Sequence, residues 1–194
     1  GKTTLLRILL GLERPDSGTV EGLAGKRLTA VFQEDRLLEH LSADGNLRFV
    51  LGRAYDPAAA RALLDRLGLP DTGPQPVREF SGGMKQRAGI ARAYTNNPEI
   101  MLMDEPFGQL DAQTRYSMQD EVLRIWESEK RTFIFVTNNI EEALYLADRI
   151  VLLTNYPAQV KEIYDINLPR PRDTVSPEFL RLRKIISDNT DLAL

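Results

Sequence analysis

The chain has 194 residues, of which 42% are hydrophobic and 27% charged, and this suits one globular domain with a buried core. Its 25 Lys and Arg against 28 Asp and Glu leave a net charge of −3, which excludes bulk electrostatic attraction for nucleic acid. With no cysteine it has no disulfide or thiolate metal site, and no apolar run approaches the roughly 20 residues of a membrane-spanning helix. We therefore expect a chain that is soluble by itself and that reaches a membrane only through a partner.

The first part of the chain predicts one helix and two short strands. Residues 4–11 have the apolar density of a buried helix, and Gly11 suits its C-terminal cap. Residues 15–18 have turn-forming types, and strands are predicted at residues 19–20 and 28–32. The second strand places Gln33 directly after its end.

Between residues 34 and 97 the pattern changes to helices and loops. Residues 57–67 predict a helix, because Pro57 stands at its start and apolar residues recur at helical spacing before Gly68. Ser81 is a good N-cap for a second helix, over residues 82–94. We expect this stretch, about 34–97, to be a helical subdomain inserted into the domain.

The second half of the chain alternates between strand and helix patterns. Apolar runs predict buried strands at residues 100–103 and 133–137 and a further strand at residues 150–153. Helices are predicted at residues 111–129, capped by Asp111, and at residues 140–147. An edge strand over residues 159–166 and a terminal helix over residues 177–187 complete the pattern. The alternation predicts an α/β fold with a mostly parallel sheet flanked by helices.

The chain opens with Gly1, Lys2, Thr3 and Thr4, which match the second half of the phosphate-binding P-loop pattern G-x-x-x-x-G-K-[ST]. Lys2 would place its charge on the β- and γ-phosphates and Thr3 would offer a hydroxyl to Mg²⁺, at the positive end of a helix dipole. The alternative is a chance Gly-Lys-Thr at a helix start. Because a P-loop connects a strand to a helix, we expect this chain to be a fragment that lacks its N-terminal strands.

Two carboxylates, Asp104 and Glu105, follow the predicted strand at residues 100–103. They would emerge at its carboxyl end, where open α/β sheets bind ligands. We expect Asp104 to hold Mg²⁺ and Glu105 to act as general base on the attacking water. The alternative, a strand that ends in solvated acids, is disfavoured by the residues that follow at 106–108 and 110–111.

A second anion-binding arrangement is formed by Ser81, Gly82 and Gly83 at the start of a predicted helix. It combines a hydroxyl, two small residues that permit close approach, and free backbone N–H groups. A capped surface helix is the alternative. Two phosphate-binding elements in one chain suggest a nucleotide shared between two subunits.

In this order the motifs resemble those of the nucleotide-binding subunit of an ABC transporter, over essentially the whole chain. Residues 80–87 (FSGGMKQR) resemble the signature motif, in which Leu normally stands at the position of Phe80. Residues 100–105 resemble the Walker B strand, and residues 108–111, which include Gln109, resemble the D-loop. Gln33 resembles the glutamine of the Q-loop. A finer resemblance, to importers of nitrate, sulfonate, taurine and bicarbonate, is carried by residues 103–108, 140–144, 168–172 and 176–180.

The resemblance implies a P-loop NTPase that hydrolyses ATP to power a membrane importer of small anionic solutes. Two such subunits, identical or different, would pair head to tail around two ATP molecules, each between one P-loop and the other subunit's signature motif. The implied partners are permease subunits, which residues 34–97 would contact at the cytoplasmic face of the cell membrane. A periplasmic or extracellular solute-binding protein would be an indirect partner, and no nucleic acid is implied. The implied nucleotide-binding residues are Gly1, Lys2, Thr3, Thr4, Gln33, Ser81, Gly82, Gly83 and Asp111, with Thr3, Gln33 and Asp104 as Mg²⁺ ligands.

One position departs from the pattern of that family. The family normally has His in a Val-Thr-His context, whereas this chain has Val136, Thr137 and Asn138. An asparagine amide can donate a hydrogen bond to a γ-phosphate, but it cannot carry a proton or a positive charge. Our hypothesis is that ATP binding survives while hydrolysis, by Glu105 with Asn138, is slowed by about one to three orders of magnitude.

Two other interpretations stay open at this point. The chain could be a hydrolysis-impaired ATP-binding partner in a heterodimeric transporter, which Asn138 favours and the intact Glu105 opposes. A soluble ABC-type ATPase acting on DNA or ribosomes is the third, but the chain has no long insertion, tandem copy or basic patch. The single histidine, His40, is expected in a solvated loop without a catalytic role.

Overall fold

The computed structural model describes residues 1–34, 36–108, 110–129 and 131–190, so Gln109 of the D-loop motif lies outside the described residues. The chain divides into two compact units, residues 2–136 and residues 137–194, and Gly1 is grouped with the second. Each unit is described by itself. No helix in the described parts is long and apolar enough to cross a membrane.

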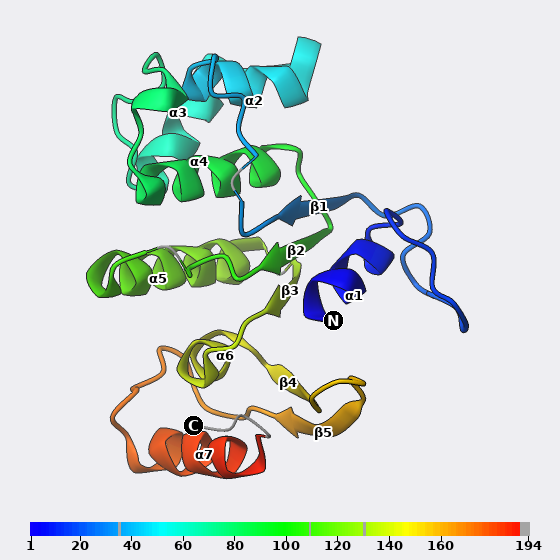
Figure 1. Cartoon of the computed structure of the whole chain (residues 1–194). Coiled ribbons are helices and arrows are strands. Elements are labelled where there is room, and N and C mark those ends of the chain that lie inside the picture. Colours follow the sequence, from blue (N-terminus) through cyan, green and yellow to red (C-terminus); the bar gives the residue numbers. More distant parts are fainter. Residues whose placement is uncertain (35, 109, 130, 191–194) are drawn as a thin grey trace. The chain divides into compact units, whose positions relative to one another are not determined.

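The first unit is built on a parallel sheet of three strands, in the order β1 (Leu28–Val31), β2 (Ile100–Asp104) and β3 (Thr132–Val136) (Figure 1). All five residues of β2 are buried, as the apolar run predicts for a central strand. Val31 lies opposite Met103 and Asp104 lies opposite Val136. The three strands therefore end at one edge of the sheet.

Helix α1 (Lys2–Leu9) packs on this sheet through Leu6, which is buried in a cluster with Ile100 and Leu102. The helix ends in a Schellman motif: Gly11, at φ +70°, donates its N–H to the Ile8 carbonyl, and the Leu12 N–H binds the Arg7 carbonyl, both at 2.9 Å. The predicted cap at Gly11 is confirmed.

Residues 43–95 of the same unit are mostly helical, with α2 (Ala43–Leu51), α3 (Pro57–Arg66) and α4 (Gly82–Thr95) separated by 3₁₀ turns at Gly52–Ala54 and Val77–Glu79. Both α2 and α3 pack against α4 (Figure 1). The loop before α2 is held by buried Asn46, whose side-chain amide exchanges two hydrogen bonds with the Leu38 backbone, at 2.9 and 3.1 Å. Helix α5 (Ala112–Glu129) follows Asp111, whose carboxylate caps it by accepting from the Thr114 N–H at 3.0 Å, as predicted.

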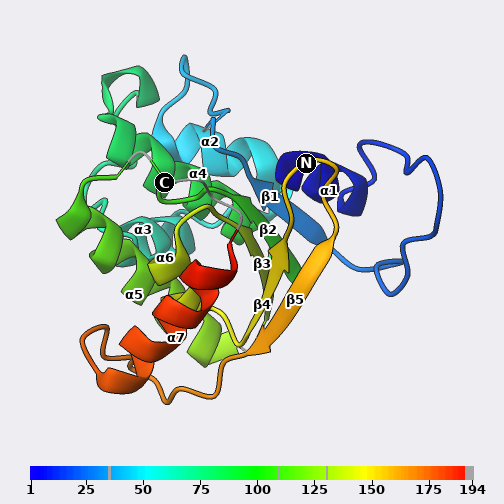
Figure 2. The ribbon, with the colours of Figure 1, turned by 60° about the horizontal axis from the view of Figure 1, so that its bottom comes forward.

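The second unit contains α6 (Ile140–Leu146), β4 (Arg149–Leu153), β5 (Val160–Asp165) and α7 (Pro177–Asn189). Strands β4 and β5 form a two-stranded antiparallel sheet, and they lie side by side in Figure 2. The core of this unit is a cluster of four buried apolar side chains from α6, α7 and the segment after β5: Leu144, Ile166, Phe179 and Ile186.

Three sequence-based predictions are corrected by the structure. Residues 19–20 form no strand and are exposed, because no described strand offers their backbone a partner. The run at 150–153, expected to join the parallel sheet, pairs antiparallel with β5 across a short connection. Strand β3, expected to be buried, is half-exposed along most of its length.

Candidate functional site

Strand register places three of the predicted site residues at one edge of the parallel sheet. Because Val31 and Met103 are opposite each other, Gln33 and Asp104 both follow at the carboxyl ends of neighbouring strands. Asp104 is only 5% exposed, whereas Gln33 is exposed to solvent. The half-buried Glu105 is the first residue after β2.

The backbone of Glu105 has a conformation that non-glycine residues rarely adopt. Its φ is +45°, and the turn is held on both sides: the Glu105 N–H donates to the Val136 carbonyl at 2.9 Å, and the Gly108 N–H donates to the Glu105 carbonyl at 3.1 Å. Such a conformation costs about 1–3 kcal/mol and persists where the surroundings over-determine it, often at functional sites. A Cβ at Gly108 would stand 3.9 Å from Oε2 of Glu105, so the carboxylate lies beside this glycine.

Lys2, Thr3 and Thr4 form the first turn of α1, where backbone N–H groups have no intrahelical partner. That turn contains no acidic residue, so nothing in it opposes an anion. The two threonines are exposed and Lys2 is half-buried. Packing of Leu6 on Ile100 and Leu102 attaches this helix to β2, the strand that carries Asp104.

The signature residues lie at the start of α4. Ser81 is exposed and caps the helix by accepting from the Met84 N–H at 3.3 Å, as predicted. A Cβ added at Gly83 would stand 3.3 Å from Cδ2 of Leu110, so this helix start packs against the D-loop segment. The structure thus brings the signature and D-loop motifs together.

Arg87 joins the start of α4 to the end of α3, a role that sequence reasoning did not assign to it. Its Nε donates to the Gly83 carbonyl at 3.2 Å and its Nη1 to the Gly68 carbonyl at 2.8 Å. Burial lowers the pKa of Arg87, and the negative charge of Asp111 partly opposes that effect. Hydrogen bonding to Thr114 in turn lowers the pKa of Asp111. Asp111 is therefore a carboxylate held beside the signature helix.

A second contact that sequence reasoning missed joins the loop after Gln33 to the signature helix. Nζ of Lys85 lies 2.5 Å from Oε1 of Glu39, and this hydrogen bond with the lysine's charge lowers the pKa of Glu39. Nη1 of Arg92 also donates to the Arg36 carbonyl at 2.8 Å. These partners are 46 and 56 residues apart, so no local sequence pattern could have paired them.

Asn138 belongs to the other unit and is exposed. Its neighbours are tied down: the Asn139 N–H donates to Oγ1 of Thr137 at 3.0 Å, and Oδ1 of Asn139 caps α6 by accepting from the Glu142 N–H at 3.1 Å. Gly1 is grouped with the same unit. His40 is exposed in a turn, as predicted.

The donor set of the first unit fits a nucleotide with Mg²⁺ better than an isolated metal centre. Among the described residues, no three His, Cys, Asp or Glu side chains converge into a metal site. Mg²⁺ is usually held by one or two carboxylates together with substrate phosphates. Asp104 offers a carboxylate and Thr3 a hydroxyl, groups that can hold Mg²⁺, and Lys2 at a helix start suits the phosphates.

Comparison with known proteins identifies the family. Residues 1–108 match the model of the family described as ABC transporter. The chain is 45% identical to an uncharacterized ABC transporter ATP-binding protein of Methanocaldococcus jannaschii, over 96% of this chain and 74% of that protein. It is 44% identical to an aliphatic sulfonates import ATP-binding protein of Nocardia farcinica, over 95% of this chain and 73% of that protein. These relatives give no support to the heterodimer alternative.

The fold is also similar to that of solved structures of ABC transporter cassettes. A dimeric bacterial ABC transporter cassette superposes with a TM-score of 0.74 at 26% identity, covering 86% of this chain and 81% of that one. A dimeric cassette in a post-hydrolysis state, bound to ADP and phosphate, superposes with a TM-score of 0.73 at 27% identity over the same shares. The chain therefore belongs to the ABC transporter family, as an ATP-binding subunit with the P-loop NTPase fold.

Proposed function

We propose that this chain hydrolyses ATP to power a membrane importer of small anionic solutes of the sulfonate, nitrate or taurine type. The observation that carries the hydrolytic part is the fixed, left-handed turn at Glu105, directly after buried Asp104. Support for the solute class comes from relatives at 38–44% identity that are named as importers of aliphatic sulfonates.

In this proposal the sheet edge and the start of α1 act on the same nucleotide. Gly1, Lys2, Thr3 and Thr4 would bind the phosphates, and Thr3, Gln33 and Asp104 would hold Mg²⁺, which neutralises phosphate charge when bound. Glu105 would orient a water molecule and accept its proton at the carboxylate. The strained turn would keep that carboxylate at the end of β2 instead of letting it rotate into solvent.

The signature and D-loop residues would serve the nucleotide of a second subunit. Ser81 is exposed, and the start of its helix packs against Leu110 and is hydrogen-bonded by Arg87 at the Gly83 carbonyl. Ser81, Gly82, Gly83 and Asp111 would thus face outward to a partner, in keeping with the dimeric cassettes that the chain resembles. Permease subunits at the cytoplasmic face of the membrane would contact residues 34–97, and a solute-binding protein would act through the permease.

Asn138 would take the place of the usual histidine. Its amide can hydrogen-bond to a γ-phosphate oxygen but cannot carry the positive charge of a protonated imidazole. Loss of one such electrostatic group costs about one to three orders of magnitude in turnover. We therefore propose an intact but slow ATPase.

The test is ATP turnover by the full-length protein in complex with its permease, with Glu105→Gln as the blank. We expect wild-type turnover above this blank and a rise of about tenfold or more in Asn138→His. The matched control is Asn167→His, which adds an imidazole at an exposed position of the same unit and should leave turnover unchanged. Wild-type and Asn138→His rates that both equal the blank, with ATP still bound, would contradict the proposal.

The solute class needs a separate measurement. With the complex in vesicles, a solute-binding protein loaded with an alkanesulfonate or nitrate should stimulate turnover, whereas a cationic amino acid should not. Stimulation by the cation alone would remove the anion assignment and leave the ATPase assignment intact.

A further inference from the structure

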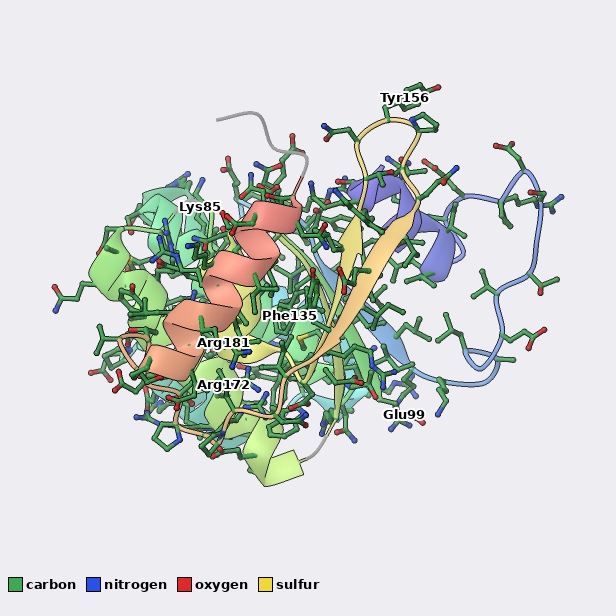
Figure 3. The ribbon with its side chains drawn as sticks, turned by 90° about the horizontal axis from the view of Figure 1, so that it is seen from below. Lys85, Glu99, Phe135, Tyr156, Arg172 and Arg181 are labelled. Atoms are coloured by element: carbon green, nitrogen blue, oxygen red, sulfur yellow. The ribbon has the colours of Figure 1, made fainter. Side chains whose placement is uncertain are left out.

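The second unit contains a buried arginine that no part of the proposed mechanism uses. Arg172, labelled in Figure 3, is 5% exposed. Its Nη1 donates to the carbonyls of Leu144 and Ala147 at 2.5 and 2.7 Å. Nη2 and Nε donate to the carbonyls of Ile166 and Leu168, both at 3.4 Å. The guanidinium therefore joins the end of α6 to the segment after β5 through backbone carbonyls alone.

A second arginine binds the same helix end. Nη2 of Arg170 donates to the Leu146 carbonyl at 2.6 Å, and its Nη1 lies 2.6 Å from Oδ1 of Asp148. The last carbonyls of a helix have no intrahelical partner, and cations at that end are favoured by the helix dipole. Burial, and then the nearby charge of Arg170, lowers the pKa of Arg172 to about 10, so Arg172 remains a cation at neutral pH.

The other end of α6 is also bound by the C-terminal segment. Nη1 of Arg183, on α7, lies 3.0 Å from Oε1 of Glu141 in the first turn of α6. Between the two ends, Leu144 is fully buried against Phe179 and Ile186 of α7. A helix of seven residues is not stable alone, so these contacts decide where α6 lies.

The start of α6 in turn determines the backbone around Asn138. Asn139 caps the helix through Glu142, and its N–H binds Oγ1 of Thr137. Both neighbours of Asn138 in the chain therefore have positions that depend on α6. A contiguous set of contacts runs from Arg172 through the helix to the residue proposed to meet the γ-phosphate.

We propose that the C-terminal segment, residues 166–189, positions Asn138 through α6, with Arg172 as the main positioning residue. This inference rests on the proposed function only in the role that it gives Asn138. Removing the guanidinium leaves the buried Leu144 carbonyl and the part-buried Ala147 carbonyl without their donor. The helix end then loosens, and the cap at Asn139 loosens with it.

The experiment compares Arg172→Met with Arg172→Lys, which retains one cation but not the four-carbonyl geometry, in the full-length protein. The matched control is Arg181→Met, an exposed arginine on α7 that is also labelled in Figure 3. Hydrogen exchange is measured at the amides of residues 139–144, with β2 as the internal reference. We expect exchange at least about tenfold faster in Arg172→Met, an intermediate rate in Arg172→Lys, and no change in Arg181→Met or in β2.

Turnover then separates positioning from simple loss of stability. A variant that only reduces the folded fraction lowers turnover by the same factor with Asn138 or with Asn138→His. Positioning predicts instead that the gain from Asn138→His disappears when Arg172→Met is also present. Equal gains in both backgrounds, or unchanged exchange at residues 139–142, would overturn the inference. If Asn138→His alone has no effect, the role of Asn138 in the proposed function fails, and the exchange rates still decide whether Arg172 positions that segment.

Discussion

Similar apolar runs form a strand in each of the two units, but the two strands differ in burial. In the first, the run of β2 lies between two parallel neighbours and is buried along its whole length. In the second, the run of β4 pairs, among the described strands, with β5 alone and is half-exposed or exposed. Burial depends on the neighbouring strands and on the helices that cover the sheet, such as α1 on β2, and apolar composition alone does not determine it.

The units also hold their candidate site residues differently. Gln33, Asp104 and Glu105 lie where they do because parallel strands in register end at one edge. Asn138 precedes a short helix whose position depends on contacts with the C-terminal segment. The positions of Gln33, Asp104 and Glu105 follow from the sheet. The position of Asn138 should change when a contact of α6 with the C-terminal segment is removed, without a substitution at any site residue.

The largest effect on stability should come from a large-to-small substitution in the core of one unit at a time. Phe179→Ala in the second unit is expected to cost about 3–5 kcal/mol, and Leu102→Ala in the first about 2–5 kcal/mol. Each side chain is almost completely buried within its own cluster. Hydrogen exchange should show faster opening of residues 140–189 in the first variant and of the parallel sheet in the second. If both variants open both units equally, the chain unfolds as one body and the comparison fails.

The two ends of β2 offer a sharper functional contrast. Glu105→Gln should lower turnover by about 100-fold or more, because the proposed general base is lost, while nucleotide binding is retained. The control is Glu99→Gln at the other end, where the carboxylate accepts from the Arg27 N–H and lies 3.9 Å from Nζ of Lys26. Turnover and binding of a fluorescent ATP analogue measure both effects. Comparable losses in the two variants would mean that the carboxyl edge has no special role.

Helix caps allow a matched comparison between the units. Ser81 caps α4 and Ser176 caps α7, and each hydroxyl accepts from a backbone N–H at 3.3 Å. Replacing either serine with Ala should cost about 1 kcal/mol in the free energy of unfolding, measured by urea denaturation. Only Ser81→Ala should also lower turnover, because only that cap is proposed to bind phosphate. Equal turnover in both variants would leave Ser81 as a cap alone.

The smallest effect concerns the exposed ion pairs. Lys85 lowers the pKa of Glu39 below its usual 4.5, so the pair stabilises the fold above that pH, and the effect is lost as the pH falls through the folded pKa. The Tm difference between wild type and Glu39→Gln should therefore be fully present at pH 7 and should decrease as the pH is lowered below 4.5. High salt should reduce it at pH 7. A difference that persists in acid would point to packing instead of charge.

Much of the first unit could be predicted because its signals are local. Helix starts at Ser81 and Asp111, the Gly11 cap and the buried strand at Ile100–Asp104 each depend on a few consecutive residues. The grouping of Gln33 and Asp104 needed one further rule, that parallel strands end together. The strand expected at residues 19–20 failed because a strand also requires a partner that its own sequence does not contain.

The family resemblance and most of the proposed site residues follow from the motifs, and the parallel α/β architecture follows from the alternation of strand and helix patterns, because each of these signals lies in neighbouring residues of the chain. Tertiary structure decided the left-handed turn of Glu105, the pairing of Glu39 with Lys85, the antiparallel direction of β4 and the burial of Arg172. Each of these depends on groups brought together across the fold. Hydrogen bonds and charges between distant residues carry no periodic signal along a chain, so only the folded arrangement could reveal them.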